Sequence, residues 1–372
     1  MAEQMLQQLP QKKLSTIQVD LDGHWVNSSY YGNTVPEYPD DIFITSIPRY
    51  LDLFEKYGVK ATFFVIGKDL EIPQKRALVK KINRAGHEVA NHTYSHIFGF
   101  RKLILSEKIL EIQRSEELIE EVIGKKPLGF KVPGYDIDIE TLQLLSSRGY
   151  LYDSSVIPTF AYPLLMGLNR FMSGGVKRSH GPKWSWCFAP NAPYWPSRDV
   201  EWRKAHGSRD RDIQGNAERG VLEVPCTTLP FFRLPFHATF INKLGFPYFW
   251  IGRQMVSMAK IPLNYEFHAV DLADDPFPQR GRRNNSVDNT DGMDNTSTGN
   301  TVMGNTIIGN TVAPHVGISL KKREALFERV IKDIASRHTV ITTEELVRRK
   351  FALSNDDRLG KCSPGNIGEK KY

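Results

Sequence analysis

Two aspartates and two histidines stand at spacings that suit a divalent metal ion. Asp20 and Asp22 lie two residues apart in the run S-T-I-Q-V-D-L-D, and residues two apart in a strand project to the same side. Two carboxylates placed together are costly unless a cation lies between them. His92 and His96 are four residues apart. If that segment turns helical, both imidazoles lie on one face and can reach one ion.

Each pair has a plainer explanation when it is taken alone. The histidines would then be solvated or would cap an element near a loop, and the aspartates would form an acidic turn or a helix N-cap. The two pairs together favour the metal, because the ion removes the cost of the paired carboxylates. One carboxylate left off the ion can also act as a base. We therefore expect one bound divalent metal ion.

Strands and helices must bring the two pairs together. Ser15 to Asp22 alternates apolar with polar residues and is followed by Gly23, as expected of a strand that ends in a turn. The piece from His87 to Ala90, just before the histidines, reads as a second strand. The same patterns predict further strands at 59–66, 128–132, 150–153, 221–225, 263–270 and 339–342, and helices at 41–57, 73–84, 106–123, 139–148 and 321–336. This alternation predicts a parallel α/β sheet.

The candidate residues fall at the carboxyl ends of these predicted strands. They are Asp20, Asp22, His92, Lys131 and Asp153. Parallel sheets collect their ligand-binding residues at these ends, in barrels and open sheets alike. The coincidence supports one shared site.

Length and composition bound the class of protein. The 372 residues, 40% of them hydrophobic, can bury one large core. The net charge of +7 is spread over short basic pairs without a nucleic-acid-binding signature, so it indicates a modest attraction to anionic lipid or a phosphate-bearing substrate. Three cysteines without paired spacing favour a reducing compartment. The polar first residues and the lack of a long apolar run predict a cytoplasmic protein.

We expect one catalytic domain at 15–353, with a polar N-terminal extension at 1–14 and a C-terminal tail at 354–372. An irregular insertion is predicted at 158–219, where tryptophans would either stack on sugar faces or fill a hydrophobic gap. Repeated Gly-Asn-Thr and scarce large apolar residues predict a low-complexity, disordered loop at 280–313.

Three motifs resemble the polysaccharide deacetylase family, also called the NodB-homology or carbohydrate esterase 4 family. They are D-L-D-G from Asp20, G-H-E-V-A-N-H-T-Y-S-H from Gly86 and G-F-K-V-P-G-Y from Gly129. They occur in the family's order, and the similarity spans roughly 16–153 and resumes near Val221. The resemblance implies a distorted (β/α)7-type barrel, the NodB-homology fold, with long loop insertions.

The resemblance also implies roles for individual residues. Asp22, His92 and His96 would hold the ion, and this ligand set suits zinc, with cobalt, manganese or nickel as alternatives. Asp20 would be the general base. His268 would protonate the leaving amine, although a lone histidine on a strand can equally be a core residue.

Three more residues complete the implied site. Lys131 stands where the family usually has Arg, so it would pair with the base without a bidentate fork; its alternative is a surface residue before a turn. Asp153 would orient and charge His268, and the Tyr135 N–H would bind the oxyanion. Leu21 separates two aspartates that are adjacent in the family, which leaves open which of them binds the metal.

The expected function is therefore a metal-dependent hydrolase that removes an N-acyl group, in the first instance acetyl, from a sugar. Without an export signal, the expected substrate is a nucleotide-, lipid- or otherwise carrier-linked glycan inside the cell, with peripheral contact to a lipid-linked substrate. Two alternatives stay open: hydrolysis of a non-sugar amide such as a cyclic imide or ureide, and a catalytically silent carbohydrate-binding relative. His237 is a weaker candidate for substrate contact.

Overall fold

The computed structural model describes residues 12–23, 25–26, 41–164, 181–205, 220–274 and 318–351. Its strands are β1 (Lys13–Asp20), β2 (Thr62–Val65), β3 (Glu88–Asn91), β4 (Gly129–Phe130), β5 (Tyr152–Asp153), β6 (Leu222–Glu223), β7 (Asn264–His268) and β8 (His338–Val340). Its α-helices are α3 (Asp41–Lys56), α4 (Pro73–Arg84), α5 (Leu105–Ile123), α6 (Ile139–Ser147), α8 (Ala238–Met258), α9 (Leu320–Arg337) and α10 (Thr343–Phe351).

The strands form one parallel sheet that curls around a central axis. The order is β6-β5-β4-β3-β2-β1-β7, and β8 pairs with the start of β1. The two ends of this order meet through Asn264 of β7, whose side-chain amide donates to the carbonyls of Val224 (3.3 Å) and Pro225 (3.1 Å) just after β6. The sheet is thus a distorted barrel, as expected from the sequence.

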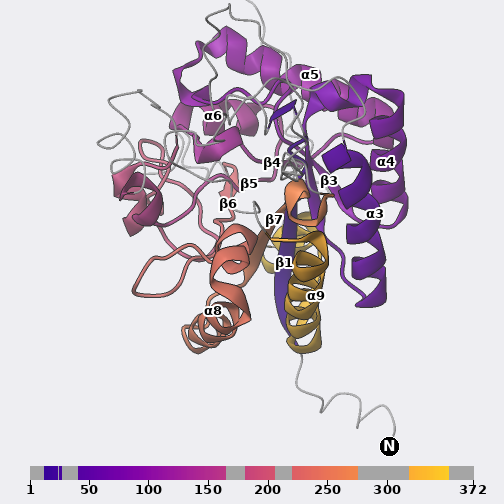
Figure 1. The fold of residues 1–372 in the computed structure, drawn as a ribbon. Helices are drawn as coiled ribbons and strands as arrows, with labels where there is room; N and C mark the ends of the chain where they lie inside the picture. The colour runs from indigo at the N-terminus through magenta and orange to yellow at the C-terminus, as the bar shows by residue number, and fades with distance from the viewer. Residues whose placement is uncertain are drawn as a thin grey trace, which may run out of the picture.

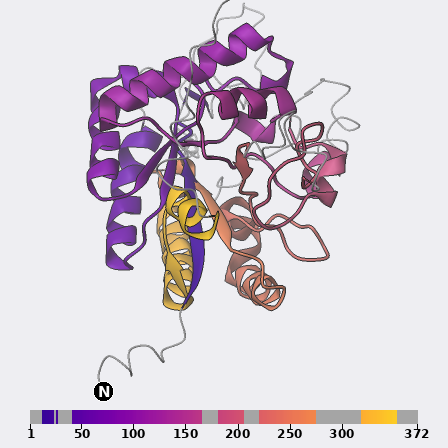
Figure 2. The same ribbon diagram turned by 180° about the vertical axis from the view of Figure 1, so that it is seen from behind.

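Helices cover the outside of this barrel, as Figures 1 and 2 show from opposite sides. Along β1 the odd residues Ile17 and Val19 are fully buried in the main hydrophobic core between sheet and helices. The even residues point into the barrel, where Thr16 donates to Asn264 (2.8 Å) and Gln18 donates to Thr343 (3.2 Å). Alternation along each strand therefore separates an apolar outer layer from a polar interior.

The lower end of the barrel is closed by the first turn of α10. The carboxylate of Glu88 accepts hydrogen bonds from Thr62 Oγ1 (2.7 Å), Tyr152 OH (2.8 Å) and the backbone N–H of Glu344 (2.9 Å). Burial, followed by the nearby charge of Glu344, raises the pKa of Glu88 to about 7. A carboxyl group in the barrel interior thus fixes the start of a helix.

This buried carboxyl group makes folding stability depend on pH. A pKa raised from 4.5 to about 7 means that the stabilisation is complete below about pH 4.5 and is lost as pH rises through 7, by up to about 3 kcal/mol. The Glu88→Gln variant is expected to lose this dependence. Denaturant unfolding of both proteins at several pH values measures the difference, and parallel pH profiles would contradict the assignment.

Most predicted elements are found, with shifts of a few residues at their ends. The strand predicted at 15–22 is β1, which begins at Lys13 and ends at Asp20, so Asp22 lies just beyond it. The aromatic stretch before β7 contains the long helix α8, which no clear periodicity announced. The insertion predicted at 158–219 is described in part: Trp186 is fully buried and fills a core, whereas Trp184 is 57% exposed.

Some sequence predictions lie outside the described residues. They concern the loop at 280–313, the tail at 354–372 and most of the extension at 1–14. In the described part of the chain, no helix has both the length and the apolar composition needed to cross a bilayer.

Candidate active site

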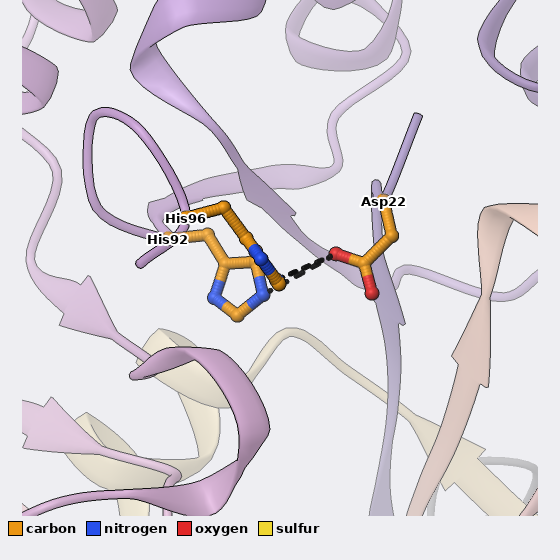
Figure 3. Close-up of side chains that lie close together, drawn as sticks. All are labelled: Asp22, His92 and His96. Atoms are coloured by element: carbon orange, nitrogen blue, oxygen red, sulfur yellow. Dashed lines mark ion pairs between the residues drawn. The ribbon is translucent and has the colours of Figure 1, made fainter. Parts of the chain in front are cut away.

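Asp22, His92 and His96 converge at the upper end of the barrel, although they come from two different strand ends. Nε2 of His92 lies 3.5 Å and Nε2 of His96 lies 3.3 Å from Oδ1 of Asp22. One ligand atom from each of the three residues lies within 4.8 Å of the others. Figure 3 shows the carboxylate of Asp22 facing both imidazole rings. This is the set of three that the sequence predicted.

The segment that carries the histidines is a loop, so the helical turn considered from the i, i+4 spacing is wrong. Thr93 (φ 63°) and His96 (φ 52°) adopt left-handed backbone conformations. Asn91 Oδ1 accepts from the N–H of Thr93 (2.9 Å), and Thr93 Oγ1 accepts from the N–H of His96 (3.2 Å). Two left-handed residues held by side-chain hydrogen bonds bring the rings to a centroid distance of 5.0 Å.

The donor atoms fit a metal ion. His92 Nδ1 lies 2.7 Å from the carbonyl oxygen of Lys131, and that acceptor requires a proton on Nδ1. In the neutral ring Nε2 then carries a lone pair directed at Asp22. A ring nitrogen and a carboxylate oxygen facing each other both need a cation between them, and a backbone carbonyl behind a ligating histidine is a common arrangement at metal sites.

Beside this triad, Lys131 joins two carboxylates. Its Nζ lies 2.8 Å from Asp20 Oδ1 and 2.9 Å from Glu266 Oε2, and the side chain is 1% exposed. Lys131 is therefore not the surface residue that the sequence allowed as an alternative. Burial alone would lower its pKa, but Asp20 and Glu266 raise the pKa above its usual range.

The two carboxylates on Lys131 differ in proton affinity. For Asp20, burial outweighs the attraction of Lys131 and raises the pKa. For Glu266, burial is outweighed by Lys131 together with His268 and His237, which lower the pKa to about 2. Neighbouring carboxyls whose pKa values are pushed apart serve different roles. Asp20 is the one suited to accept a proton, and Glu266 remains ionised.

Sequence reasoning missed Glu266. It is 1% exposed, and its second oxygen accepts a hydrogen bond from the hydroxyl of Tyr135. The available signal was its position two residues before His268 on a strand, the same rule that paired Asp20 with Asp22. The pairing of β1 with β7 places His268 directly opposite Asp20, so Glu266, His268 and Asp20 lie in one region of the sheet.

His268 faces the same space as the base. Its Nε2 lies 3.7 Å from Oε1 of Glu266, and its backbone is held by Tyr50, whose OH donates to its carbonyl (2.8 Å), and by Asp271, which accepts from its N–H (2.8 Å). Burial would lower the pKa of His268, but Glu266 and then Asp20 raise it. An imidazole with a raised pKa is suited to donate a proton.

Asp153 does not take the position implied for it. Ser154 faces the barrel interior, where its Oγ donates to Gln18 (3.1 Å), so the preceding side chain faces the outside. There the buried Asp153 accepts a hydrogen bond from Ser155 Oγ (2.6 Å), and its carboxyl group lies beside that of Glu223. Burial raises the pKa of Asp153 to about 6 and that of Glu223 further above its usual range. Glu266, not Asp153, is the carboxylate beside His268.

The remaining candidates, Tyr135 and His237, lie near Glu266 and His268. Gly134 (φ 64°) and Tyr135 (φ 55°) turn the backbone after β4 in a left-handed conformation, and the Tyr135 hydroxyl contacts Glu266, which also contacts Lys131. His237 is buried and its Nε2 lies 2.8 Å from the hydroxyl of Tyr162. The His237 ring lies 6.4 Å from the ring of His268. A hollow of about 240 Å³ opens next to the triad, and it is lined by Trp25, Val26, Ser95, His96, Ile97 and Phe98.

Part of the site lies in a segment of the chain that is similar to known proteins. Residues 39–152 match the family model described as polysaccharide deacetylase. Over this segment, about 30% of the chain, the sequence is similar to the polysaccharide deacetylase family. The segment contains His92, His96, Lys131 and Tyr135, whereas both aspartates of the site and His268 lie outside it.

Curated relatives show the same sequence similarity, and a solved structure shows the same fold. The chain is 34% identical over 147 residues to a peptidoglycan deacetylase of Helicobacter pylori, covering 38% of this chain and 48% of that protein. It is 33% identical over 108 residues to a peptidoglycan-N-acetylglucosamine deacetylase of Bacillus cereus, covering 28% and 48%. The crystal structure of a candidate polysaccharide deacetylase from Mycobacterium smegmatis superposes with a TM-score of 0.52 at 16% identity, covering 93% and 92%. The chain thus spans about half the length of these two curated relatives, and the structural likeness supports the fold.

Proposed function

We propose that this protein is a metal-dependent hydrolase that removes an N-acyl group, in the first instance acetyl, from a sugar of a polysaccharide or glycan. The observation that carries the proposal is the convergence of Asp22, His92 and His96 beside a second group of Asp20, Glu266 and His268. The first group offers metal ligands, and the second offers a base and an acid. The names of the curated relatives, peptidoglycan and chitin deacetylases, agree with this chemistry.

Asp22, His92 and His96 would hold one divalent ion. One carboxylate and two imidazoles are a common catalytic zinc set that leaves room for water and substrate, and cobalt, manganese or nickel suit the same donors. When bound, the ion polarises the acyl oxygen and lowers the pKa of water.

The chain's own residues then handle the protons. Asp20 accepts a proton from the attacking water, because its buried carboxyl has a raised pKa while Lys131 fixes one of its oxygens. His268 donates a proton to the nitrogen that leaves as the amine, and ionised Glu266, 3.7 Å away, stabilises the imidazolium before that transfer. The Tyr135 N–H binds the oxygen of the acyl group as negative charge develops there.

For the substrate, we propose an N-acetylated glycan, carried inside the cell on a nucleotide, a lipid or another carrier. The hollow beside His96 supports a sugar-binding role, because Trp25 and Phe98 in its lining offer apolar faces and sugar rings stack on aromatic side chains. Trp25 is also oriented by its Nε1–H, which donates to Asp69 (2.8 Å). The proposed location inside the cell is supported by three cysteines without paired spacing.

Metal removal tests the proposed function. Dialysis against a chelator is expected to abolish acetate release from N-acetylglucosamine oligosaccharides, and zinc or cobalt is expected to restore it, because the bound ion would polarise the acyl group and lower the pKa of water. Elemental analysis of the purified protein should show about one ion per chain. His96→Ala should lose this ion, whereas Trp184→Ala, at an exposed position away from the triad, should keep it.

Three outcomes would contradict the proposal. Full activity after metal removal would rule out the ion, and full metal content in His96→Ala would rule out the ligand set. Ring opening of small cyclic imides without acetate release from the oligosaccharides would instead identify an amidohydrolase of non-sugar substrates.

A further inference from the structure

The outer face of α8 and a neighbouring hairpin expose large apolar side chains. In the hairpin at 228–235, Phe231 is 90% and Phe232 is 60% exposed. On α8, Trp250 is 48%, Ile251 is 52% and Met258 is 81% exposed. Single exposed apolar residues are ordinary, but several that share one surface mark a place of contact.

The exposed residues of α8 lie on one side of the helix. Trp250 and Ile251 are adjacent, Gln254 follows them by four and three residues, and Met258 follows Gln254 by four, which places these four exposed side chains along one side of the helix. The opposite face is buried against the barrel. Both ribbon views place α8 at the edge of the molecule, on the other side of the sheet from α3 and α4 (Figures 1 and 2).

The hairpin packs against α8 and holds its two phenylalanines outward. Thr228 bridges to Pro235, and the N–H of Leu229 donates to the carbonyl of Leu234 (2.8 Å). A side chain at Gly252 of α8 would collide with Leu229, so hairpin and helix are in close contact. At the tip Phe231 adopts φ 65°, a conformation that is rare for a bulky residue and marks places where function outweighs local strain.

This part of the chain also has an unusual charge pattern. No Asp or Glu occurs between Glu223 and Glu266, although the chain has 42 acidic residues in 372, so about five would be expected in a stretch of this length. The charged residues here are all basic. Lys243 lies in the first part of α8, before the break in the helix at Gly245, and Lys260 follows its end. Both are exposed, so in the sequence they stand on either side of residues 250–258.

We propose that the tip of the hairpin and the outer face of α8 form a docking surface for an anionic lipid bilayer. Aromatic and aliphatic side chains would enter the interface between headgroups and acyl chains, while the flanking lysines would contact the negative headgroups. A second copy of this chain fits less well, because a symmetric contact would bring Lys243 and Lys260 toward their own copies, and Asp333, an acidic residue that contacts α8, is already paired with Arg253. The surface lies outside the metal site, and its role does not depend on the proposed reaction.

Vesicle sedimentation of the whole protein tests this surface without any enzymatic assay. The protein is expected to bind phosphatidylcholine vesicles that contain phosphatidylglycerol, to bind pure phosphatidylcholine much less, and to dissociate as salt is raised. The Phe231→Ser, Phe232→Ser double variant should lower binding by at least ~10-fold. Lys243→Glu with Lys260→Glu should remove the preference for anionic vesicles.

A matched control is available at the other end of the molecule. Ile104 and Leu110, at and after the start of α5, are 66% and 67% exposed, and their replacement by Ser should leave vesicle binding unchanged. All substituted side chains are exposed, and circular dichroism checks the fold. The proposal is overturned if the wild-type protein binds no vesicles or if the control variant loses as much binding. It is also overturned if sedimentation velocity shows a dimer that Trp250→Ser dissociates.

Discussion

Asp20→Asn is expected to lower kcat/KM for an N-acetylated glycan by about 10²- to 10⁴-fold, the usual contribution of a general base, while the metal content stays unchanged. The reason is its place in the site: its carboxylate lies on Lys131, beside the metal triad but not part of it. An amide keeps the size of the side chain and removes its ability to accept the proton. Steady-state kinetics and elemental analysis on the same preparation measure both quantities.

Asp22→Asn is the matched control for this substitution. It makes the same chemical change two residues away, at the carboxylate that faces His92 and His96, and it should lower metal content as well as activity. Excess zinc should partly restore this variant and should not restore Asp20→Asn. If Asp20→Asn lost the ion and Asp22→Asn kept it, the two roles would have to be exchanged.

Lys131→Met should destabilise the fold by about 3–5 kcal/mol near neutral pH, the usual effect of removing one partner of a buried ion pair. The variant would leave Asp20 and Glu266 buried with no ammonium between them. Because protonation of these carboxyls relieves the repulsion, the loss should shrink as the pH is lowered. Denaturant unfolding of wild type and variant across a pH series measures it.

Two further variants separate charge from packing at this position. Lys131→Arg keeps the charge and should lose much less stability. Adding Glu266→Gln to Lys131→Met removes one of the unpaired charges and should recover part of the loss, so the two substitutions should be non-additive. Additive effects, or a loss that does not change with pH, would show that packing of the lysine chain is what matters.

Much of the fold was predictable because periodic patterns mark most of the strands and helices of the barrel, although not α8. The buried run from Val59 to Ile66 contains β2, and α4 ends at Arg84 as predicted. Residue type and strand order were enough to predict that the aspartates and the two histidines lie together, and the family resemblance selected Asp22 as the one that joins His92 and His96. Its local geometry was not, since the left-handed conformations of Thr93 and His96 depend on hydrogen bonds from side chains that a spacing rule does not include.

The second half of the site was harder to predict for a physical reason. Which of two carboxylates meets an imidazole depends on which face of a strand each one occupies, and β5, with two residues, is too short for an alternation to be read. Asp153 turned outward because Ser154 turned inward, and Glu266 on β7 took the position beside His268. A family pattern transferred to Asp153 therefore pointed to the wrong carboxylate.

Lys131 contacts both halves of the site with different parts of one residue. Its carbonyl oxygen lies 2.7 Å from Nδ1 of His92, and its ammonium group lies 2.8 Å from Asp20. A displacement of this short segment after β4 would tilt a ligand imidazole and shift the proton acceptor at the same moment. Metal content and turnover should consequently decline together in variants of the neighbouring Pro133–Tyr135 turn. This should hold even where the substituted side chain contacts neither His92 nor Asp20.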